Sequence, residues 1–177
     1  MPLDRLTAPA FALGLAAALT AAPPARAEVA EVRASRAINA SADALYAYLL
    51  DLSHHPQVWP EGCTADWELG AVQAGPGASA ELTYRVGGWR RRLPVQVGPV
   101  QPGARIELLH PGKKGFTTIW TLQPGDGVTK VSVDTWVGAP PKPFKGFYEK
   151  RVRPGWTECH VGLLDNLARE MARVAPR

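Results

Sequence analysis

Residues 64–137 consist of short strand patterns separated by turns rich in glycine and proline, and few folds accommodate such a run. Apolar and polar residues alternate in several segments, as in Ala80, Leu82 and Tyr84, which places the apolar side chains on one face of a sheet. The turns are too short for crossover helices, so neighbouring strands must run antiparallel. The predicted strands are 29–38, 64–69, 78–86, 89–100, 105–110, 116–122 and 128–137.

A long amphipathic helix is predicted near the C-terminus. A short helical piece at 144–152 is expected first, and Pro154 then suits the first turn of a new helix. Apolar residues recur from there at intervals of three and four positions, and about 20 residues of helix are long enough to cross the sheet. The predicted apolar stripe consists of Trp156, His160, Leu163, Leu164, Leu167, Met171 and Val174.

Two short helices are predicted between the first strand and the meander. Ser41 is a good N-cap, with Asp43 in the first turn, and the helix should end by Asp51. A second helical turn is expected across 53–58. The predicted fold class is therefore α+β: a curved antiparallel sheet of six to seven strands around a long C-terminal helix, with two short helices after the first strand.

Several local strings resemble the SRPBCC superfamily, which includes START-like lipid-transfer domains, polyketide cyclases and coenzyme Q-binding proteins. They are Ile38 to Tyr46, then Leu50-Asp51-Leu52 with Pro56 and Trp59-Pro60, and later Trp120 to Pro124 with Gly127 to Val131. The resemblance covers about residues 30–174 and implies the helix-grip fold, with a hydrophobic pocket between the sheet and the C-terminal helix. It names no reaction, because members of the superfamily range from enzymes to pure binders.

The first 27 residues have the pattern of a secretory signal peptide. An apolar stretch from Ala8 to Ala22 follows Arg5, and Ala25-Arg26-Ala27 supplies small residues before a cleavage point. The stretch is shorter than the roughly 20 residues that span a bilayer. We predict a signal peptide at 1–27 and a ligand-binding domain at 28–177, located in the periplasm or secreted; an uncleaved N-terminal anchor is the alternative.

The chain has only two cysteines, Cys63 and Cys159. In an oxidising compartment they could form one disulfide bond. The sequence alone leaves open whether their Cα atoms are close enough for that bond, and two buried free thiols are the alternative.

Sequence motifs for catalysis or metal binding are absent from the chain. The four histidines, His54, His55, His110 and His160, have no metal-ligand spacing with each other or with the cysteines, and no nucleophile elbow or phosphate-binding glycine loop occurs. We therefore expect no metal, no cofactor and no catalytic residue, and we favour a protein that is not an enzyme.

The candidate ligand-binding residues are mainly aromatic and apolar side chains on the inward faces. Large apolar surfaces with a few polar groups are typical of hydrophobic ligand sites, although ordinary core packing would use the same residues. His160 could supply a polar group, and Arg91 shares the parity of Leu93 and could approach the mouth of the pocket. The predicted set is Tyr84, Arg91, Val95, Trp120, Trp156, His160 and Leu163.

The charge of the chain argues against a nucleic-acid partner. The 20 basic and 16 acidic residues give a net charge of +4, and removing Arg5, Arg26 and Asp4 with the leader leaves 18 and 15, a net of +3. This excess is mild. The segment 142–153 interleaves basic residues with Phe144 and Phe147, and could make transient contact with an anionic membrane.

The leading functional prediction is an exported binder or carrier of a hydrophobic small molecule that is a lipid, an isoprenoid or polyketide-like. The sequence carries no signal for the oligomeric state. One alternative is a cyclase, dehydratase or isomerase on the same scaffold that uses a pocket acid or His160. The other is a protein-interaction module whose pocket is filled by tryptophan side chains.

Overall fold

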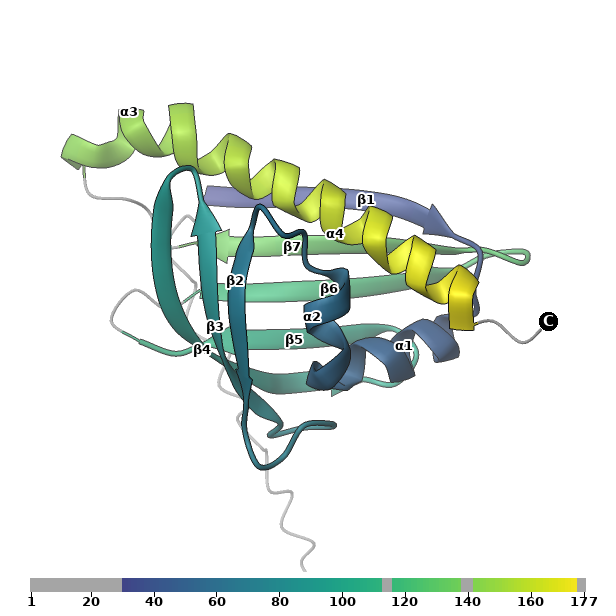
Figure 1. Cartoon of the computed structure of the whole chain (residues 1–177). Helices are drawn as coiled ribbons and strands as arrows, with labels where there is room; N and C mark the ends of the chain where they lie inside the picture. Colours follow the sequence, from purple (N-terminus) through teal and green to yellow (C-terminus); the bar gives the residue numbers. More distant parts are fainter. Residues whose placement is uncertain (1–29, 113–115, 138–141, 175–177) are drawn as a thin grey trace, which may run out of the picture.

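One antiparallel sheet of seven strands forms the frame of the molecule (Figure 1). The structure is a computed structural model that describes residues 30–112, 116–137 and 142–174; the predicted leader lies outside these residues. The strand order is β1-β7-β6-β5-β4-β3-β2, so the last strand brings the first one into the sheet. The strands are β1 (Ala30–Ile38), β2 (Thr64–Leu69), β3 (Ser79–Val86), β4 (Trp89–Gln101), β5 (Arg105–His110), β6 (Phe116–Pro124) and β7 (Thr129–Val137).

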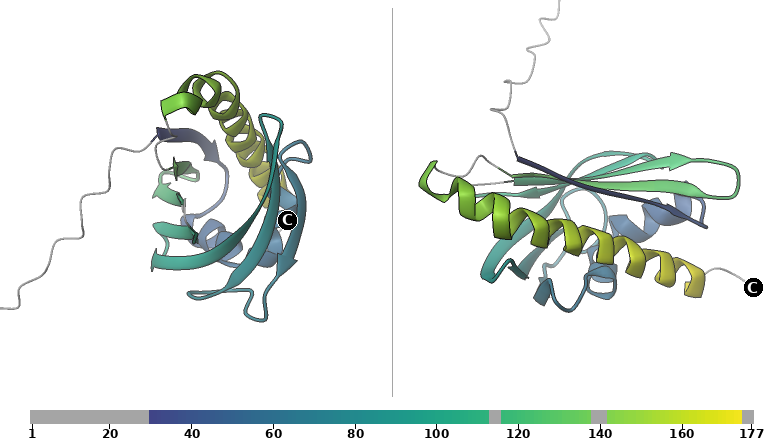
Figure 2. Two further views of the ribbon diagram at one scale, coloured as in Figure 1. Left: turned by 90° about the vertical axis from the view of Figure 1, so that its left-hand side faces the viewer. Right: turned by 90° about the horizontal axis from the view of Figure 1, so that it is seen from above.

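The predicted short helices follow β1 and pack on the inner face of the sheet. The hydroxyl of Ser41 accepts a hydrogen bond from the Ala44 amide at 3.2 Å, so Ser41 caps α1 (Ala42–Leu50) as expected. After η1 (Leu52–His54) comes α2 (His55–Val58). Helix α1 contacts β5 and β6, and α2 contacts the long C-terminal helix. Together these helices cover one end of the curved sheet (Figure 2).

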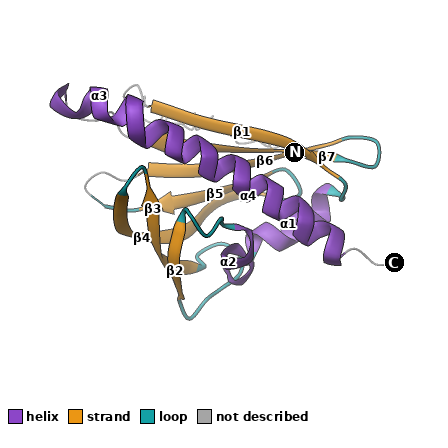
Figure 3. Cartoon of the chain, turned by 45° about the horizontal axis from the view of Figure 1, so that its top comes forward, coloured by secondary structure: helices purple, strands orange, loops and turns teal. Residues whose placement is uncertain are grey.

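The C-terminal helix α4 (Arg153–Val174) crosses the inner face of the sheet and contacts β1 (Figure 3). Its buried residues are those of the predicted stripe and Cys159, with one exception. Val174 is 52% exposed, because the last turn of the helix extends beyond the core. None of the helices in the described ranges is long and apolar enough to cross a membrane.

Pro154 lies in the first turn of α4 and a short helical piece precedes it, as predicted, but no break separates the two. Helical structure runs without a break through η2 (Lys142–Phe144), α3 (Lys145–Phe147) and η3 (Tyr148–Val152) into α4, and η3 is a π-helical turn. Pro154 has no N–H for the carbonyl of Lys150, and its ring would clash with that carbonyl in a regular helix. The wider π-turn immediately before Pro154 accommodates the proline within one continuous helix.

Close backbone approaches hold the β3–β4 hairpin against the first turns of this helix. A Cβ atom on Gly87 would lie only 2.6 Å from the carbonyl oxygen of Arg151. One on Gly155 would lie 3.0 Å from the amide nitrogen of Gly87. Glycine at both positions therefore permits the contact between hairpin and helix.

A disulfide bond ties the middle of the helix to the start of β2. The structure links Cys63 to Cys159, with their Cα atoms 5.7 Å apart and a sequence separation of 96. One turn further along α4, a Cβ on Gly162 would meet the ring of Pro60 at 2.8 Å. The segment before β2 is thus held against α4 by a covalent bond and a close contact.

The two glycines of the β3–β4 turn allow a matched test of the hairpin contact. Gly87 and Gly88 both have positive φ, 57° and 82°, so alanine strains the backbone at either position by about 1 kcal/mol. Only Gly87→Ala also forces a Cβ against Arg151, since nothing lies within 4 Å of a Cβ at Gly88. We expect Gly87→Ala to lower the free energy of unfolding in urea by at least about 1 kcal/mol more than Gly88→Ala. Equal losses would contradict the contact.

Removing the disulfide should destabilise the fold without changing it. For a loop closed across 96 positions, the chain-entropy model gives about 4–5 kcal/mol. We expect Cys63→Ala/Cys159→Ala to lose about that much free energy of unfolding in urea relative to the oxidised parent. The parent in reductant is the control, and should behave like the double variant. A difference below about 1 kcal/mol would mean that the cross-link restrains little of the unfolded chain.

Candidate functional site

Inward-facing side chains from five consecutive strands pack between the sheet and α4. Alternation along β3 to β7 places apolar residues there, as the sequence pattern predicts. Three of the predicted site residues, Val95, Trp120 and Leu163, are at most 1% exposed in this core. Trp120 lies edge-on to His55, with ring centroids 6.4 Å apart.

Trp156, in the first turn of α4, is the centre of an aromatic group. Its ring centroid lies 5.2 Å from that of Tyr84, 5.9 Å from Phe116, 5.8 Å from His160 and 6.3 Å from Trp59. These rings come from β3, β6, α4 and the segment after α2. The structure therefore brings together three of the predicted residues, Tyr84, Trp156 and His160.

A row of four polar side chains crosses this apolar interior, and we call it the histidine–threonine chain. Nε2 of His160 lies 3.0 Å from the hydroxyl of Thr135, which lies 3.1 Å from the hydroxyl of Thr118. That hydroxyl in turn lies 3.3 Å from Nε2 of His110. The four residues come from α4, β7, β6 and β5, and all are buried. The chain is thus a continuous hydrogen-bonded strip from the helix across three strands.

Aromatic contacts join the two ends of the histidine–threonine chain by a second route. The ring of His110 stacks on Phe116, with centroids 4.0 Å apart and planes inclined by 25°. Phe116 contacts Trp156, which contacts His160. The same two histidines are therefore connected both by hydrogen bonds through the threonines and by ring contacts through Phe116 and Trp156. The candidate site thus has a polar side and an apolar side.

Burial keeps the histidines of the interior neutral. It lowers the pKa of His160 and of His110 from 6.5 to about 4, and for His110 the nearby carbonyl of Pro94 opposes the shift. Burial also lowers the pKa of His55 to about 4, against the hydrogen bond to the carbonyl of Leu49. At neutral pH these imidazoles therefore carry no charge.

The neutral state fixes how protons are shared along the histidine–threonine chain. Three hydrogen bonds need three protons, and the hydroxyls of Thr118 and Thr135 supply two. One and only one of the two histidines must therefore carry its proton on Nε2. If His160 carries its proton on Nε2, its Nδ1 has no proton and can only accept a hydrogen bond. If instead His110 carries its proton on Nε2, the proton of His160 lies on Nδ1, which is then a donor. The tautomers of two distant histidines are thereby coupled.

Several buried polar atoms of the interior make no hydrogen bond within the described residues. Nδ1 of His160 and the hydroxyl of Tyr148 are among them, as are the indole nitrogens of Trp59, Trp67 and Trp120. A buried polar group without a partner costs about 1–3 kcal/mol. The interior therefore offers hydrogen-bonding capacity that the described residues do not use.

Arg91 differs from the other predicted residues in its exposure to solvent. It is exposed and pairs in register with Tyr84 across β3 and β4. Burial raises the pKa of the Tyr84 hydroxyl, and the charge of Arg91 opposes that shift. It therefore lies beside Tyr84 of the aromatic group, and its predicted place at the mouth of a pocket and its part in binding stay predictions.

The predicted set of site residues did not include His110, Thr118, Thr135, Phe116 or Tyr148. For the four residues on strands, the alternation along the strand already predicted an inward position, because they share the parity of the apolar inward residues. A histidine or threonine at such a position is a polar group inside the core, and it needs a partner. For Tyr148 the π-turn decides the direction of the side chain, and no local pattern announces it.

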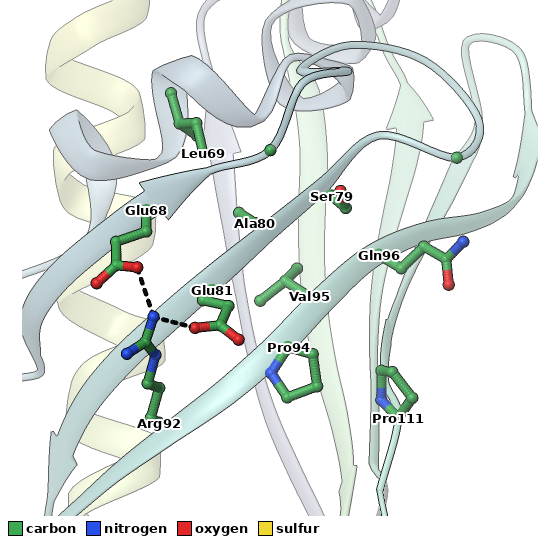
Figure 4. Close-up of a pocket in the computed structure, with 12 residues that line it drawn as sticks. Glu68, Leu69, Ser79, Ala80, Glu81, Arg92, Pro94, Val95, Gln96 and Pro111 are labelled. Carbon is green, nitrogen blue, oxygen red and sulfur yellow. Dashed lines mark hydrogen bonds and ion pairs between the residues drawn. The ribbon is translucent and has the colours of Figure 1, made fainter.

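The outer face of β2, β3 and β4 carries a separate, open groove of about 690 Å³ (Figure 4). Arg92 bridges the carboxylates of Glu68 and Glu81 there, so its one positive charge offsets one of their two negative charges. All three side chains are about half exposed, where ion pairs contribute little. Across the described ranges no three His, Cys, Asp or Glu side chains are arranged to hold a metal ion.

The neutral buried histidines predict a loss of stability in acid. On unfolding, a histidine with a native pKa of about 4 returns to 6.5 and takes up a proton below that pH, so acid favours the unfolded state. Stability should be constant above pH of about 6.5, then fall by about 2 kcal/mol per buried histidine on going from about pH 7 to about pH 5. Urea unfolding at about pH 7 and about pH 5 measures this loss of stability. In His160→Asn the loss should be smaller by the contribution of one histidine, about 2 kcal/mol. A variant with the full fall would show that His160 is not held neutral.

Comparison with known proteins identifies the family to which the chain belongs. Residues 29–172 match the family described as polyketide cyclase / dehydrase and lipid transport. A search of curated proteins found no significant match.

Solved structures similar to this one share its fold at low sequence identity. TTHA0849 from Thermus thermophilus is 19% identical, with a TM-score of 0.70 over 83% of this chain and 100% of that one. A START superfamily protein from Mycobacterium smegmatis is 16% identical, with a TM-score of 0.60 over 82% and 99%. The major latex-like protein 151 of Panax ginseng is 6% identical, with a TM-score of 0.63 over 80% and 97%. The chain therefore belongs to the polyketide cyclase/dehydrase and lipid transport family, and it has the helix-grip fold of the SRPBCC superfamily.

Proposed function

We propose that this protein binds and carries a hydrophobic small molecule between the sheet and α4, and that the histidine–threonine chain holds the one polar group of that molecule. The observation that carries the proposal is a hydrogen-bonded strip of four buried polar side chains in a largely apolar, aromatic interior. Ligand sites of this kind combine a large apolar surface with a few polar groups that set orientation. Family membership supports the same class of ligand.

The apolar surface would supply affinity and the polar strip would supply selectivity. Burying about 300 Å² of apolar ligand surface is worth on the order of 7 kcal/mol before ordering costs. A ligand hydroxyl or carbonyl could pair with Nδ1 of His160, which otherwise has no partner among the described residues. The coupled tautomers allow that nitrogen to act either as donor or as acceptor.

The low pKa of His160 favours a binding function over the enzyme alternative. A neutral imidazole with a free nitrogen could in principle accept a proton from a substrate. A general base works best when its pKa lies near the operating pH, and a pKa of about 4 makes His160 a weak base at neutral pH. The same property suits a neutral hydrogen-bonding group.

We further propose that the carrier works outside the cytoplasm. The signal-peptide pattern at 1–27 motivates this location. The disulfide between Cys63 and Cys159 adds support, because such bonds persist in oxidising compartments. Edman sequencing of the protein recovered from its own envelope should begin at Glu28, and a start at Met1 would favour the uncleaved anchor.

Paired ligands that differ by one hydroxyl test the proposed function. Calorimetric titration with naphthalene and 2-naphthol should show binding of both, with 2-naphthol about fivefold tighter, the worth of roughly one hydrogen bond. Thr135→Val keeps the side-chain volume and breaks the histidine–threonine chain, so it should abolish the preference while naphthalene binding stays. Thr121→Val makes the same exchange on the outward face of β6 and is the control.

A second variant separates uptake from folding. Trp156→Ala should weaken the binding of palmitate and of naphthalene by more than tenfold, because it removes the central ring of the aromatic group. Its free energy of unfolding is measured in parallel. Failure of the folded parent to take up any of these ligands would reject the carrier in favour of an interaction module.

A further inference from the structure

The first turns of the C-terminal helical segment project beyond the strands (Figure 1). Two large apolar side chains are exposed there, Phe144 by 56% and Phe147 by 41%. In the same segment Tyr148 and Val152 are buried, 5% and 4% exposed. The segment therefore packs one side into the core and presents two phenylalanines on the other.

Positive charge surrounds these phenylalanines. Lys142, Lys145, Lys150 and Arg151 are all exposed, and none of them makes an ion pair within the described parts of the chain. The one acidic residue of the segment, Glu149, pairs with Arg153 at 3.1 Å. The charge of the four cations is thus not compensated by a neighbouring carboxylate.

The β3–β4 hairpin adds two more cations at the same end of the molecule. Its turn contacts the helix, since a Cβ on Gly87 would meet the carbonyl oxygen of Arg151. Arg85 and Arg90 pair in register directly beside this turn, and both are exposed. Neither makes an ion pair with a described residue. We call the helical segment 142–151 with Arg85 and Arg90 the basic–aromatic end.

We propose that the basic–aromatic end docks on the surface of an anionic lipid bilayer. Exposed phenylalanines flanked by lysine and arginine are the composition of surfaces that lie in a membrane interface, where rings enter the acyl boundary and cations face lipid phosphates. The charge is complementary to anionic lipid and concentrated at one end, whereas the protein as a whole has only a mild excess.

Docking in this way would bring the interior close to the bilayer. Tyr148 lies in the docking segment and faces inward, close enough to Tyr84 for the two hydroxyls to interact electrostatically. The docking surface itself consists of exposed side chains and stands without the proposed ligand site. Its test therefore needs no ligand.

Co-sedimentation of the full chain with vesicles tests the proposal. We expect binding to phosphatidylcholine vesicles that contain one-third phosphatidylglycerol at low salt, weaker binding at high salt, and little binding to phosphatidylcholine alone. Each cation near an anionic surface is worth about fivefold in partitioning. Lys145→Glu/Lys150→Glu should therefore lower the partition coefficient at least about 25-fold, and Phe144→Ser about tenfold.

A matched charge reversal elsewhere is the control. Lys130→Glu/Arg169→Glu changes the net charge equally on exposed positions of β7 and late α4, and should cost far less binding. Equal losses in the two double variants would overturn the proposal, as would failure of the parent to bind anionic vesicles. Heparin binding as tight as vesicle binding, with Phe144→Ser without effect, would assign the surface to a soluble polyanion instead. Uptake of 2-naphthol by the same variants should stay at the parent's level, which separates this test from that of the ligand site.

Discussion

The apolar inner face of the sheet has to be covered, and the packing of α4 against that face is the interaction on which the rest of the structure depends. A sheet with one apolar face exposes a large surface to water unless another layer buries it. Helix α4 covers this surface with one stripe of side chains, and α1 and α2 cover the end that α4 leaves open. The hairpin contact at Gly87 and the disulfide at Cys159 restrain the helix in this position.

Because the cover is a helix, polar groups from distant parts of the chain meet beneath it. His160 reaches from α4 to Thr135, and the hydrogen bonds continue through Thr118 to His110. In a low-dielectric interior such a strip is stable only when its members satisfy one another. Burial also removes the charge of both histidines, so the strip introduces no ion into the core.

The two proposed surfaces lie next to each other on the same helical segment. The π-turn places Tyr148 inside while Phe144 remains outside, so a short stretch of chain belongs both to the interior and to the basic–aromatic end. Pro154 accounts for this local geometry, because a regular helix could not accommodate its ring. A protein that exchanges a hydrophobic molecule with a bilayer would need such a junction between its interior and its surface.

The sequence by itself determined the strands, the turns, the Ser41 cap and the apolar stripe of α4, because these follow from local periodicity and from turn chemistry. It also indicated Tyr84, Trp156 and His160, which lie on inward faces. It did not reveal that His160 meets Thr135, or that His110 stacks on Phe116. Those contacts depend on the register between strands and on the rotation of α4 over the sheet, and both are set by packing between residues far apart in the chain. Only the tertiary structure therefore decided which buried polar groups are paired and which have no hydrogen-bond partner among the described residues.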